Sequence, residues 1–219
     1  MEVKKYIIIL VLLILSSCSS GRDNEKIEKM IDILFSQNKE KKVVKITAEK
    51  IKNVNYPIIE IKTDGILIQS TFLPMTSRNG YTNWTSGIGH LITMNGAIIT
   101  KTNGMNAFLN SLEFNDFNPF NNKTNLQKLP KSLSKEYRFL EPTYQEKIIV
   151  VNCDLIFEKK ENVVVLDNKL NLFKIIEKCY NEQLKFSSLY WMDENGFVWK
   201  SKQWLGNKVN AEITVLKTR

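Results

Sequence analysis

Residues 91–102, LITMNGAIITKT, place two short apolar and β-branched runs on either side of Asn95-Gly96. An Asn-Gly pair between two such runs predicts a β-hairpin with a type I′ turn. Two further turn signals lie between expected strands: Asp64-Gly65 between residues 58–62 and 66–73, and Asp193 to Gly196 between residues 189–192 and 197–204. Three hairpins joined by short links predict an antiparallel sheet.

Further runs with strand character follow the same pattern. The segment 172–180, LFKIIEKCY, suits a helix or a strand, and a strand is favoured because its neighbours are strands. Helices do not alternate with strands, so a parallel sheet is not expected. We therefore predict a mainly β fold, an antiparallel meander closed or nearly closed into a β-barrel-like domain, since closure removes exposed edges. The additional expected strands are residues 42–51, 81–85, 97–102, 136–143, 147–158, 162–167, 172–180 and 211–216.

Two segments depart from the strand pattern. Residues 25–35 carry apolar side chains at helical spacing and predict a short N-terminal amphipathic helix. Residues 108–134 are rich in Asn and poor in β-branched residues, and they predict a long irregular connection. The domain expected from these patterns is a single β-rich unit over residues 25–219.

The first 24 residues have the character of an export signal followed by a tether. Lys4 and Lys5 precede the apolar run 6–15, which as a helix would span about 15 Å, half of a bilayer core. The sequence Leu15-Ser16-Ser17-Cys18 resembles the lipobox of bacterial lipoproteins. We predict a lipoprotein signal peptide at 1–17, a diacylglyceryl-modified Cys18 and a flexible tether at 18–24. An ordinary secretory signal with a chance Cys is the alternative.

The predicted lipid defines a location. Acyl chains, palmitate among them, would hold Cys18 in a bilayer, and two or more chains give stable anchoring. Ser19, rather than Asp, follows the modified Cys. By resemblance to lipoprotein sorting in Gram-negative bacteria, this favours the outer membrane of the cell envelope.

Composition excludes several functional classes. The 219 residues contain one His and three Cys, too few for a His-rich metal site or a four-thiolate site, and no cofactor is expected. The net charge of +8 includes no clustered basic run, and an exported lipoprotein does not meet nucleic acid. With Cys18 modified, Cys153 and Cys179 remain as an even pair that could form a disulfide in an oxidising compartment. Two buried thiols are the alternative.

Motifs of common enzymes are absent from the sequence, including the Walker loop, HExxH and the G-x-S-x-G elbow. Asp154 and Glu158 would share one face of a strand, and Asp193 lies in a turn; solvated surface positions are the simpler interpretation. Aromatic residues cluster near two hairpins, and flat rings can stack on sugars, although core packing explains them equally well. The residues considered for glycan or partner contact are Trp84, Ser86, Tyr190, Trp191, Trp199, Ser201 and Gln203.

Two groups of short motifs occur in a fixed order. The first is Trp84-x-Ser86, the hairpin at 91–99, and Thr102-x-Gly104; the second is Glu177-x-Cys179, Tyr190-Trp191-x-Asp193 and Trp199-x-Ser201-x-Gln203. Together with the lipobox they resemble the YjbF/GfcB-like lipoprotein family. Ala97 stands where that family often carries Arg, so the resemblance does not extend an anion-binding role to this position.

The resemblance implies a β-barrel-like fold and a part in group 4 capsule and related exopolysaccharide production, beside polysaccharide export components. It implies a process rather than a reaction. We therefore expect a non-enzymatic outer-membrane lipoprotein that assists assembly or export of a capsular or extracellular polysaccharide by binding glycan or export-complex proteins. The alternatives are an envelope enzyme that modifies or trims polysaccharide, and a purely structural lipoprotein.

Overall fold

The computed structural model describes residues 46–64, 69–105, 108–121, 124, 126–141, 143–207 and 209–218, all within one compact unit, Val43–Arg219. The predicted signal peptide, Cys18, the tether and the helix expected at 25–35 lie outside the described residues. Among the described helices, none has the length and apolar character needed to cross a membrane.

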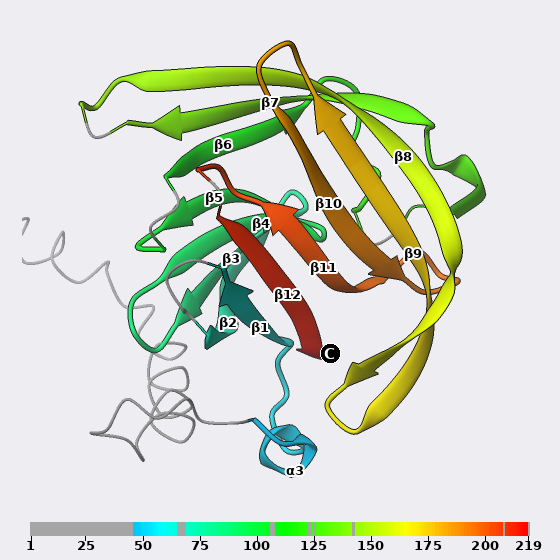
Figure 1. The fold of residues 1–219 in the computed structure, drawn as a ribbon. Helices are drawn as coiled ribbons and strands as arrows, with labels where there is room; N and C mark the ends of the chain where they lie inside the picture. Colours follow the sequence, from blue (N-terminus) through cyan, green and yellow to red (C-terminus); the bar gives the residue numbers. More distant parts are fainter. Residues whose placement is uncertain are drawn as a thin grey trace, which may run out of the picture. The chain divides into compact units, whose positions relative to one another are not determined.

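The unit is almost entirely β-structure (Figure 1). Its helical elements are α3 (Ala48–Ile51) and a 3₁₀ turn, η1 (Leu126–Lys128). The strands are β1 (Ile58–Thr63), β2 (Gln69–Arg78), β3 (Tyr81–Ser86), β4 (Leu91–Asn95), β5 (Ile98–Asn103), β6 (Leu109–Phe114), β7 (Ser132–Leu140), β8 (Glu146–Val165), β9 (Asn168–Tyr180), β10 (Lys185–Met192), β11 (Val198–Trp204) and β12 (Asn210–Lys217).

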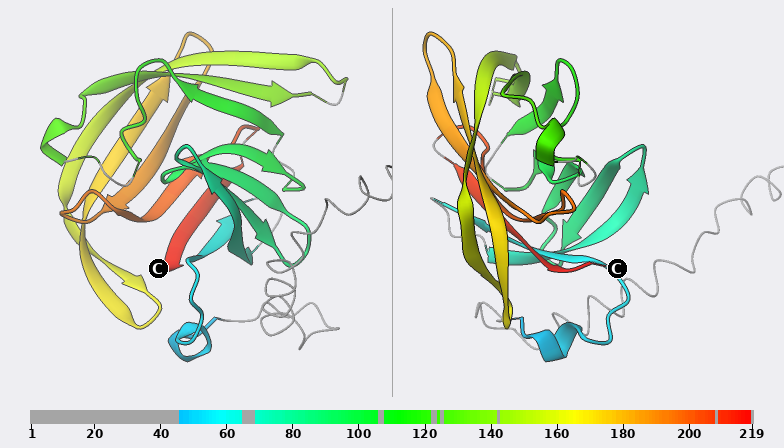
Figure 2. Two further views of the ribbon diagram at one scale, coloured as in Figure 1. Left: turned by 180° about the vertical axis from the view of Figure 1, so that it is seen from behind. Right: turned by 90° about the vertical axis from the view of Figure 1, so that its right-hand side faces the viewer.

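The twelve strands form one antiparallel sheet that nearly closes into a barrel, as predicted. The strand order is β5-β4-β3-β2-β1-β12-β11-β10-β9-β8-β7-β6, so the first and last strands of the chain pair with each other. The two outer strands in this order, β5 and β6, also lie against each other. The Leu109 N–H donates to Thr102 Oγ1 across that seam at 3.2 Å. Figure 2 shows the sheet curving back on itself.

The barrel interior holds the main hydrophobic core, and part of it is filled by the segment between β6 and β7. Phe120 from this segment is fully buried and stacks on Tyr190 with ring centroids 3.8 Å apart. The Ala97 N–H donates to the Phe120 carbonyl at 2.8 Å. A Cβ at Gly96 would collide with the backbone of Phe120 and Asn121. Glycine at this turn therefore allows the segment to pack directly over the β4–β5 hairpin.

The hairpins predicted around Asn95-Gly96 and Asp193–Gly196 are present, but the first has a different turn. Asn95 pairs with Ile98, so the two central residues are Gly96 and Ala97. Of these, only Gly96 has a positive φ, 58°, which is the pattern of a type II′ turn rather than type I′. Asn79-Gly80, between β2 and β3, has positive φ at both residues and the type I′ pattern.

Three other expectations were wrong in detail. Residues 48–51, expected at the end of a strand, form α3, because the Thr47 side chain accepts from Lys50 N and caps a helical turn. The segment expected to be irregular, 108–134, contains β6, which pairs with β7. The two strands expected at 147–158 and 162–167 are one continuous strand, β8, with a bulge between Phe157 and Lys160 in place of a turn, and the chain reverses at Leu166-Asp167 instead. The choice of strand for 172–180 is confirmed by β9.

Candidate functional site

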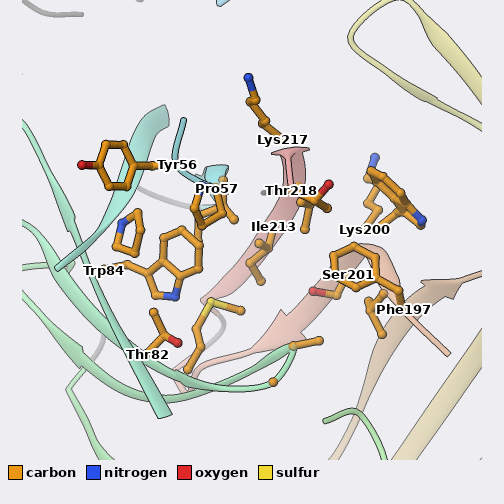
Figure 3. Close-up of a pocket in the computed structure, with 18 of the residues that line it drawn as sticks. Tyr56, Pro57, Thr82, Trp84, Phe197, Lys200, Ser201, Ile213, Lys217 and Thr218 are labelled. Carbon is orange, nitrogen blue, oxygen red and sulfur yellow. The ribbon is translucent and has the colours of Figure 1, made fainter. Parts of the chain in front are cut away.

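One end of the barrel interior is hollow. A cavity of about 510 Å³ lies between the ends of β2, β4 and β12 and the beginnings of β1, β3 and β11 (Figure 3). Its wall is mostly apolar and has an aromatic part. The apolar and aromatic lining residues are Tyr56, Pro57, Ile59, Pro74, Trp84, Met94, Ala97, Phe197, Val198, Trp199, Ile213 and Val215.

Local sequence explains why this end is not filled. Pro74 lies in β2 where the register with β3 shifts, and a proline cannot donate to the sheet at that point. Pro57 precedes β1, and Ala97 and Ser201 present small side chains to the interior. Rigid rings and small side chains at the strand ends leave space that the larger residues of the core occupy elsewhere.

Trp84 carries the main polar atom of the cavity wall. Its side chain is buried, with 9% of the residue exposed, and its Nε1–H has no acceptor among the described residues. Ser201 lies on the opposite wall with its hydroxyl directed into the cavity (Figure 3). The Ser201 Oγ accepts a hydrogen bond from Gln203 Nε2 at 2.9 Å, so its own O–H is left to donate. Trp84 and Ser201 thus present two buried donors to the cavity.

Gln203, by contrast, has a structural role. Its Oε1 accepts from Ile99 N at 3.0 Å, and its Nε2 donates to the Ala97 carbonyl at 2.7 Å. The side chain is buried and connects β11 to the β4–β5 hairpin across the interior. Gln203 therefore holds the floor of the cavity together rather than offering its amide to a ligand.

The charged groups of the lining are two lysines and no carboxylates. Lys217 Nζ donates to the carbonyls of Ile51 and Lys52, at 3.0 Å each, and so ends α3. Lys200 Nζ pairs with Glu212 at 3.1 Å. The lining therefore offers a ligand two ammonium groups, each already paired with an acceptor, and no carboxylate.

Three of the seven residues predicted for glycan or partner contact line the cavity: Trp84, Trp199 and Ser201. Tyr190 is buried in the core, where its OH donates to Glu177 Oε2 at 3.1 Å. Trp191 packs on the other face of the sheet with Val163, Val165 and Leu172. Its indole donates to Glu161.

The last of the predicted residues stabilise turns or the core. Ser86 Oγ accepts from His90 N at 3.1 Å within the β3–β4 link. Asp193 of the Tyr190-Trp191-x-Asp193 motif also belongs to a turn: its Oδ1 accepts from Asn195 N and Phe197 N, and its Oδ2 accepts from Trp199 Nε1 at 2.9 Å. These contacts explain Asp193 as a residue that stabilises the turn.

The packed part of the interior contains a buried ion pair. Lys135 Nζ lies 2.6 Å from Glu177 Oε1, and both side chains are inaccessible, with exposures of 1% and 0%. Burial lowers the pKa of Lys135, and Glu177 opposes that change. Burial also raises the pKa of Tyr137 and of Tyr190 well above their ordinary value, and the Glu177 carboxylate adds to both shifts.

Cys153 and Cys179 face each other across β8 and β9 and are joined by a disulfide with an S–S distance of 2.07 Å. They lie in the main core beside Glu177. Because the two sulfurs are bonded to each other, neither remains as a thiolate ligand for a metal.

Sequence patterns did not identify a second hollow at the opposite ends of β11 and β12. Two adjoining depressions, of about 690 and 320 Å³, share Lys147, Ile149, Trp204 and Asn207; we call them together the Trp204 groove. The Trp204 ring stacks on Phe186 with centroids 4.0 Å apart. Lys147 and Lys185 are exposed in the groove, and neither forms an ion pair with another described residue. The tryptophan was visible in the sequence, but its lysine neighbours come from distant strands.

Comparisons with known proteins agree with the fold. The family described as group 4 capsule polysaccharide lipoprotein gfcB, YjbF, matches residues 28–216. A solved structure of the hypothetical lipoprotein YmcC from Escherichia coli (K12) is similar in fold, with a TM-score of 0.68, 14% identity, and coverage of 80% of this chain and 90% of that chain. An exported protein of YmcC-like fold from Bacteroides fragilis NCTC 9343 matches at a TM-score of 0.34 and 9% identity over 74% and 94%, too weakly to carry an argument. No curated protein matches the sequence.

Proposed function

Because the chain belongs to the family of group 4 capsule polysaccharide lipoproteins, we propose that it assists the assembly or export of a capsular or extracellular polysaccharide at the outer membrane. In this proposal it acts without catalysis, by binding the glycan or a component of the export machinery. Acylated Cys18 holds it in the bilayer. The 28 residues between Cys18 and Thr47, the cap of α3, form the connection to the barrel.

The Trp204 groove is the observation that carries glycan binding. It combines a stacked aromatic pair, Trp204 and Phe186, with the cationic groups of Lys147 and Lys185. Flat apolar rings pack against the faces of sugars, and lysine ammonium groups attract the carboxylates of an acidic polymer. The third lysine of the groove, Lys202, is paired with Asp64 at 3.0 Å and contributes less. An acidic polysaccharide segment is the ligand that this combination fits.

The cellular test compares surface and intracellular polymer in three strains: the parent, a gene deletion, and Cys18→Ala. Loss of surface polymer in both altered strains is the expected result, since the protein must be present and anchored. A deletion strain with unchanged amount, length and location of polymer would remove the proposed role.

The binding test targets the two unpaired lysines of the groove. Lys147→Glu with Lys185→Glu reverses two charges without touching the aromatic pair. We expect this variant to retain less of the cell's acidic polysaccharide in a pull-down, with a flatter dependence on salt. The matched control is Lys159→Glu with Lys169→Glu, which reverses two exposed lysines that do not line the groove. Equal retention by both double variants would contradict the assignment of the groove.

A further inference from the structure

The cavity at Trp84 differs from the Trp204 groove in what it offers a ligand. Its volume of about 510 Å³ falls within the usual range of small-molecule sites, roughly 300–1,000 Å³. Its deeper walls come from Ile59, Met94, Val198, Ile213 and Val215, whose side chains carry no hydrogen-bonding oxygen or nitrogen. Such walls favour a hydrocarbon group, because binding removes apolar surface of both the wall and the ligand from contact with water.

The polar atoms of the interior wall determine which polar group a ligand must carry. The Trp84 Nε1–H is buried without an acceptor among the described residues, and the Ser201 hydroxyl faces the same space. Buried donors are nearly always paired, because an unpaired one loses its hydrogen bond to water. A ligand that brings an oxygen acceptor to this point, and at most one donor, completes the wall.

The same inventory argues against a sugar in this cavity. Sugar hydroxyls are donors as well as acceptors, and the lining contains no carboxylate. The amide of Gln203 is already used by Ile99 and Ala97, and Asn55, the carboxamide in the lining, is exposed in the segment before β1. The hydroxyl groups of Tyr56, Ser77, Thr82, Ser201 and Thr218 are the remaining side-chain acceptors of the lining, too few for the many hydroxyls of a buried sugar, so burying a sugar here would cost free energy.

We propose that the cavity binds one long-chain fatty acyl group, with its carbonyl oxygen accepting a hydrogen bond from Trp84 Nε1–H and its hydrocarbon chain lying along Ile59, Ile213 and Val215. A protonated fatty acid and an acyl ester share this chemistry. The opening lies among residues 55–57 and 217–218, at the beginning of β1 and the end of β12. This assignment is independent of the polysaccharide role, since it concerns a different site and a different ligand.

The test uses the acylated full-length protein in vesicles of phosphatidylethanolamine and phosphatidylglycerol. Two probes carry a photoactivatable diazirine in the chain: palmitic acid and 1-palmitoyl lysophosphatidylglycerol. After irradiation, we expect adducts on the peptides that contain Met94 and Val215. Labelling by the acid alone identifies a free fatty acid as the ligand, and labelling by both identifies the acyl group. Adducts confined to residues outside the cavity would overturn the proposal.

A cavity-filling variant and a matched control separate binding in the cavity from contact with the vesicle. Val215→Trp places a large ring in the cavity, whereas Leu216→Trp places it on the neighbouring residue of β12, which points to the other face of the sheet. We expect Val215→Trp to lose most of the labelling and Leu216→Trp to keep it. Equal labelling of the two variants would overturn the proposal. Resistance of the buried Cys153–Cys179 disulfide to added reductant under native conditions shows that each variant is folded.

The carbonyl contact is tested by competition. Trp84→Phe keeps the aromatic ring and removes the donor. Unlabelled palmitic acid should compete about three- to tenfold less well with the probe in this variant, the range of one net hydrogen bond. Hexadecane, which has no acceptor, should compete equally well in both proteins. If Trp84→Phe weakens both competitors alike, or neither, the hydrogen bond to the acyl carbonyl is wrong.

Discussion

The two halves of the barrel interior contain similar kinds of residue but use them differently. In the packed half, Phe120 stacks on Tyr190, and the buried Glu177 carboxylate contacts the Lys135 ammonium through one oxygen and the Tyr190 hydroxyl through the other. In the hollow half, Trp84 buries an N–H that has no acceptor among the described residues. Buried polar groups with complete partners stabilise a fold, whereas an unpaired donor beside an open cavity marks a place for a ligand.

The difference arises from one segment of the chain. The connection after β6 brings Phe120 into the interior, and Asn118 holds it there by donating to the Asn95 carbonyl at 2.8 Å. The turn at Gly196 packs equally closely on this segment, since a Cβ there would collide with the carbonyl of Thr124. No comparable segment of the described chain enters the half that contains Trp84, so that half stays open.

The largest effect on this comparison is expected from breaking the buried ion pair. Glu177→Gln leaves the Lys135 ammonium buried without a counter-charge, which should cost about 3–5 kcal/mol of unfolding free energy. Urea unfolding of the purified protein measures it. Glu60→Gln, which breaks a pair with the exposed Lys62, is the control and should cost at most about 1 kcal/mol. Similar midpoints for the two variants would mean that the packed half does not depend on its ion pair.

The next effect concerns the disulfide of the packed half. Cys153→Ala with Cys179→Ala opens a loop whose ends are 26 residues apart. The chain-entropy treatment gives a loss of roughly 3.5 kcal/mol for a loop of that length. Urea unfolding with and without reductant measures this: the parent should fall to the level of the double variant when reduced, and the variant should not respond. A reductant response in the variant would contradict the assignment.

Alkaline pH should also act on the packed half. Burial raises the pKa of Tyr137 and Tyr190 well above the ordinary value of 10.0, so only the unfolded chain ionises them just above that pH. Their contribution to stability is complete below pH 10 and declines as the pH rises toward the folded pKa. Each tyrosine should lower the free energy of unfolding by about 1.4 kcal/mol when the pH reaches 11. The lowered pKa of Lys135 acts in the opposite direction.

Stability measured from pH 8 to 11 in the parent and in Tyr190→Phe isolates one tyrosine. The variant should show a shallower alkaline decline. Parallel curves for the two proteins would show that Tyr190 ionises equally in the folded and unfolded chains.

The smallest expected effect on stability comes from two variants that each remove one buried hydrogen-bond donor, one from each half of the interior. Tyr190→Phe removes the hydrogen bond to Glu177 and should lower the free energy of unfolding by about 1–3 kcal/mol. Trp84→Phe removes a donor that has no acceptor, and in the ligand-free protein it should change stability by less than about 1 kcal/mol. Thermal unfolding of both variants checks this pair. A cost for Trp84→Phe equal to that of Tyr190→Phe would place an unrecognised acceptor beside the indole.

Much of the fold was predictable because its cause is local. The alternating runs around Asn95-Gly96 and Asp193–Gly196 predict hairpins, and hairpins in succession predict an antiparallel meander. The predictions were wrong in detail where a contact between residues distant in the sequence decides the local structure. The β4–β5 turn shifts by one residue where Gly96 meets Phe120, and β8 continues through residues 159–161, because β9 pairs on both sides of the bulge.

The candidate sites were less predictable. Trp84 and Ser201 were recognised as residues of interest, yet nothing in their spacing shows that they face each other across a cavity. Tyr190 and Trp191 are adjacent aromatic residues that sequence composition does not distinguish. In the structure Tyr190 lies in the main core, whereas Trp191 packs with Val163, Val165 and Leu172 on the other face of the sheet. The Trp204 groove depends on lysines from β8 and β10, which no local pattern connects to β11.

The sequence by itself determined the class of fold, because this depends on the period of the pattern, on composition and on neighbouring residues, whereas the export signal at 1–17 stays a prediction. Only the tertiary structure decided which aromatic rings are core and which line a cavity, and which lysines have partners. Adjacent residues of a strand point to opposite faces. Closing a barrel brings together groups that are a hundred residues or more apart in the sequence, as in the hydrogen bond from the Gln203 side chain to the Ala97 carbonyl.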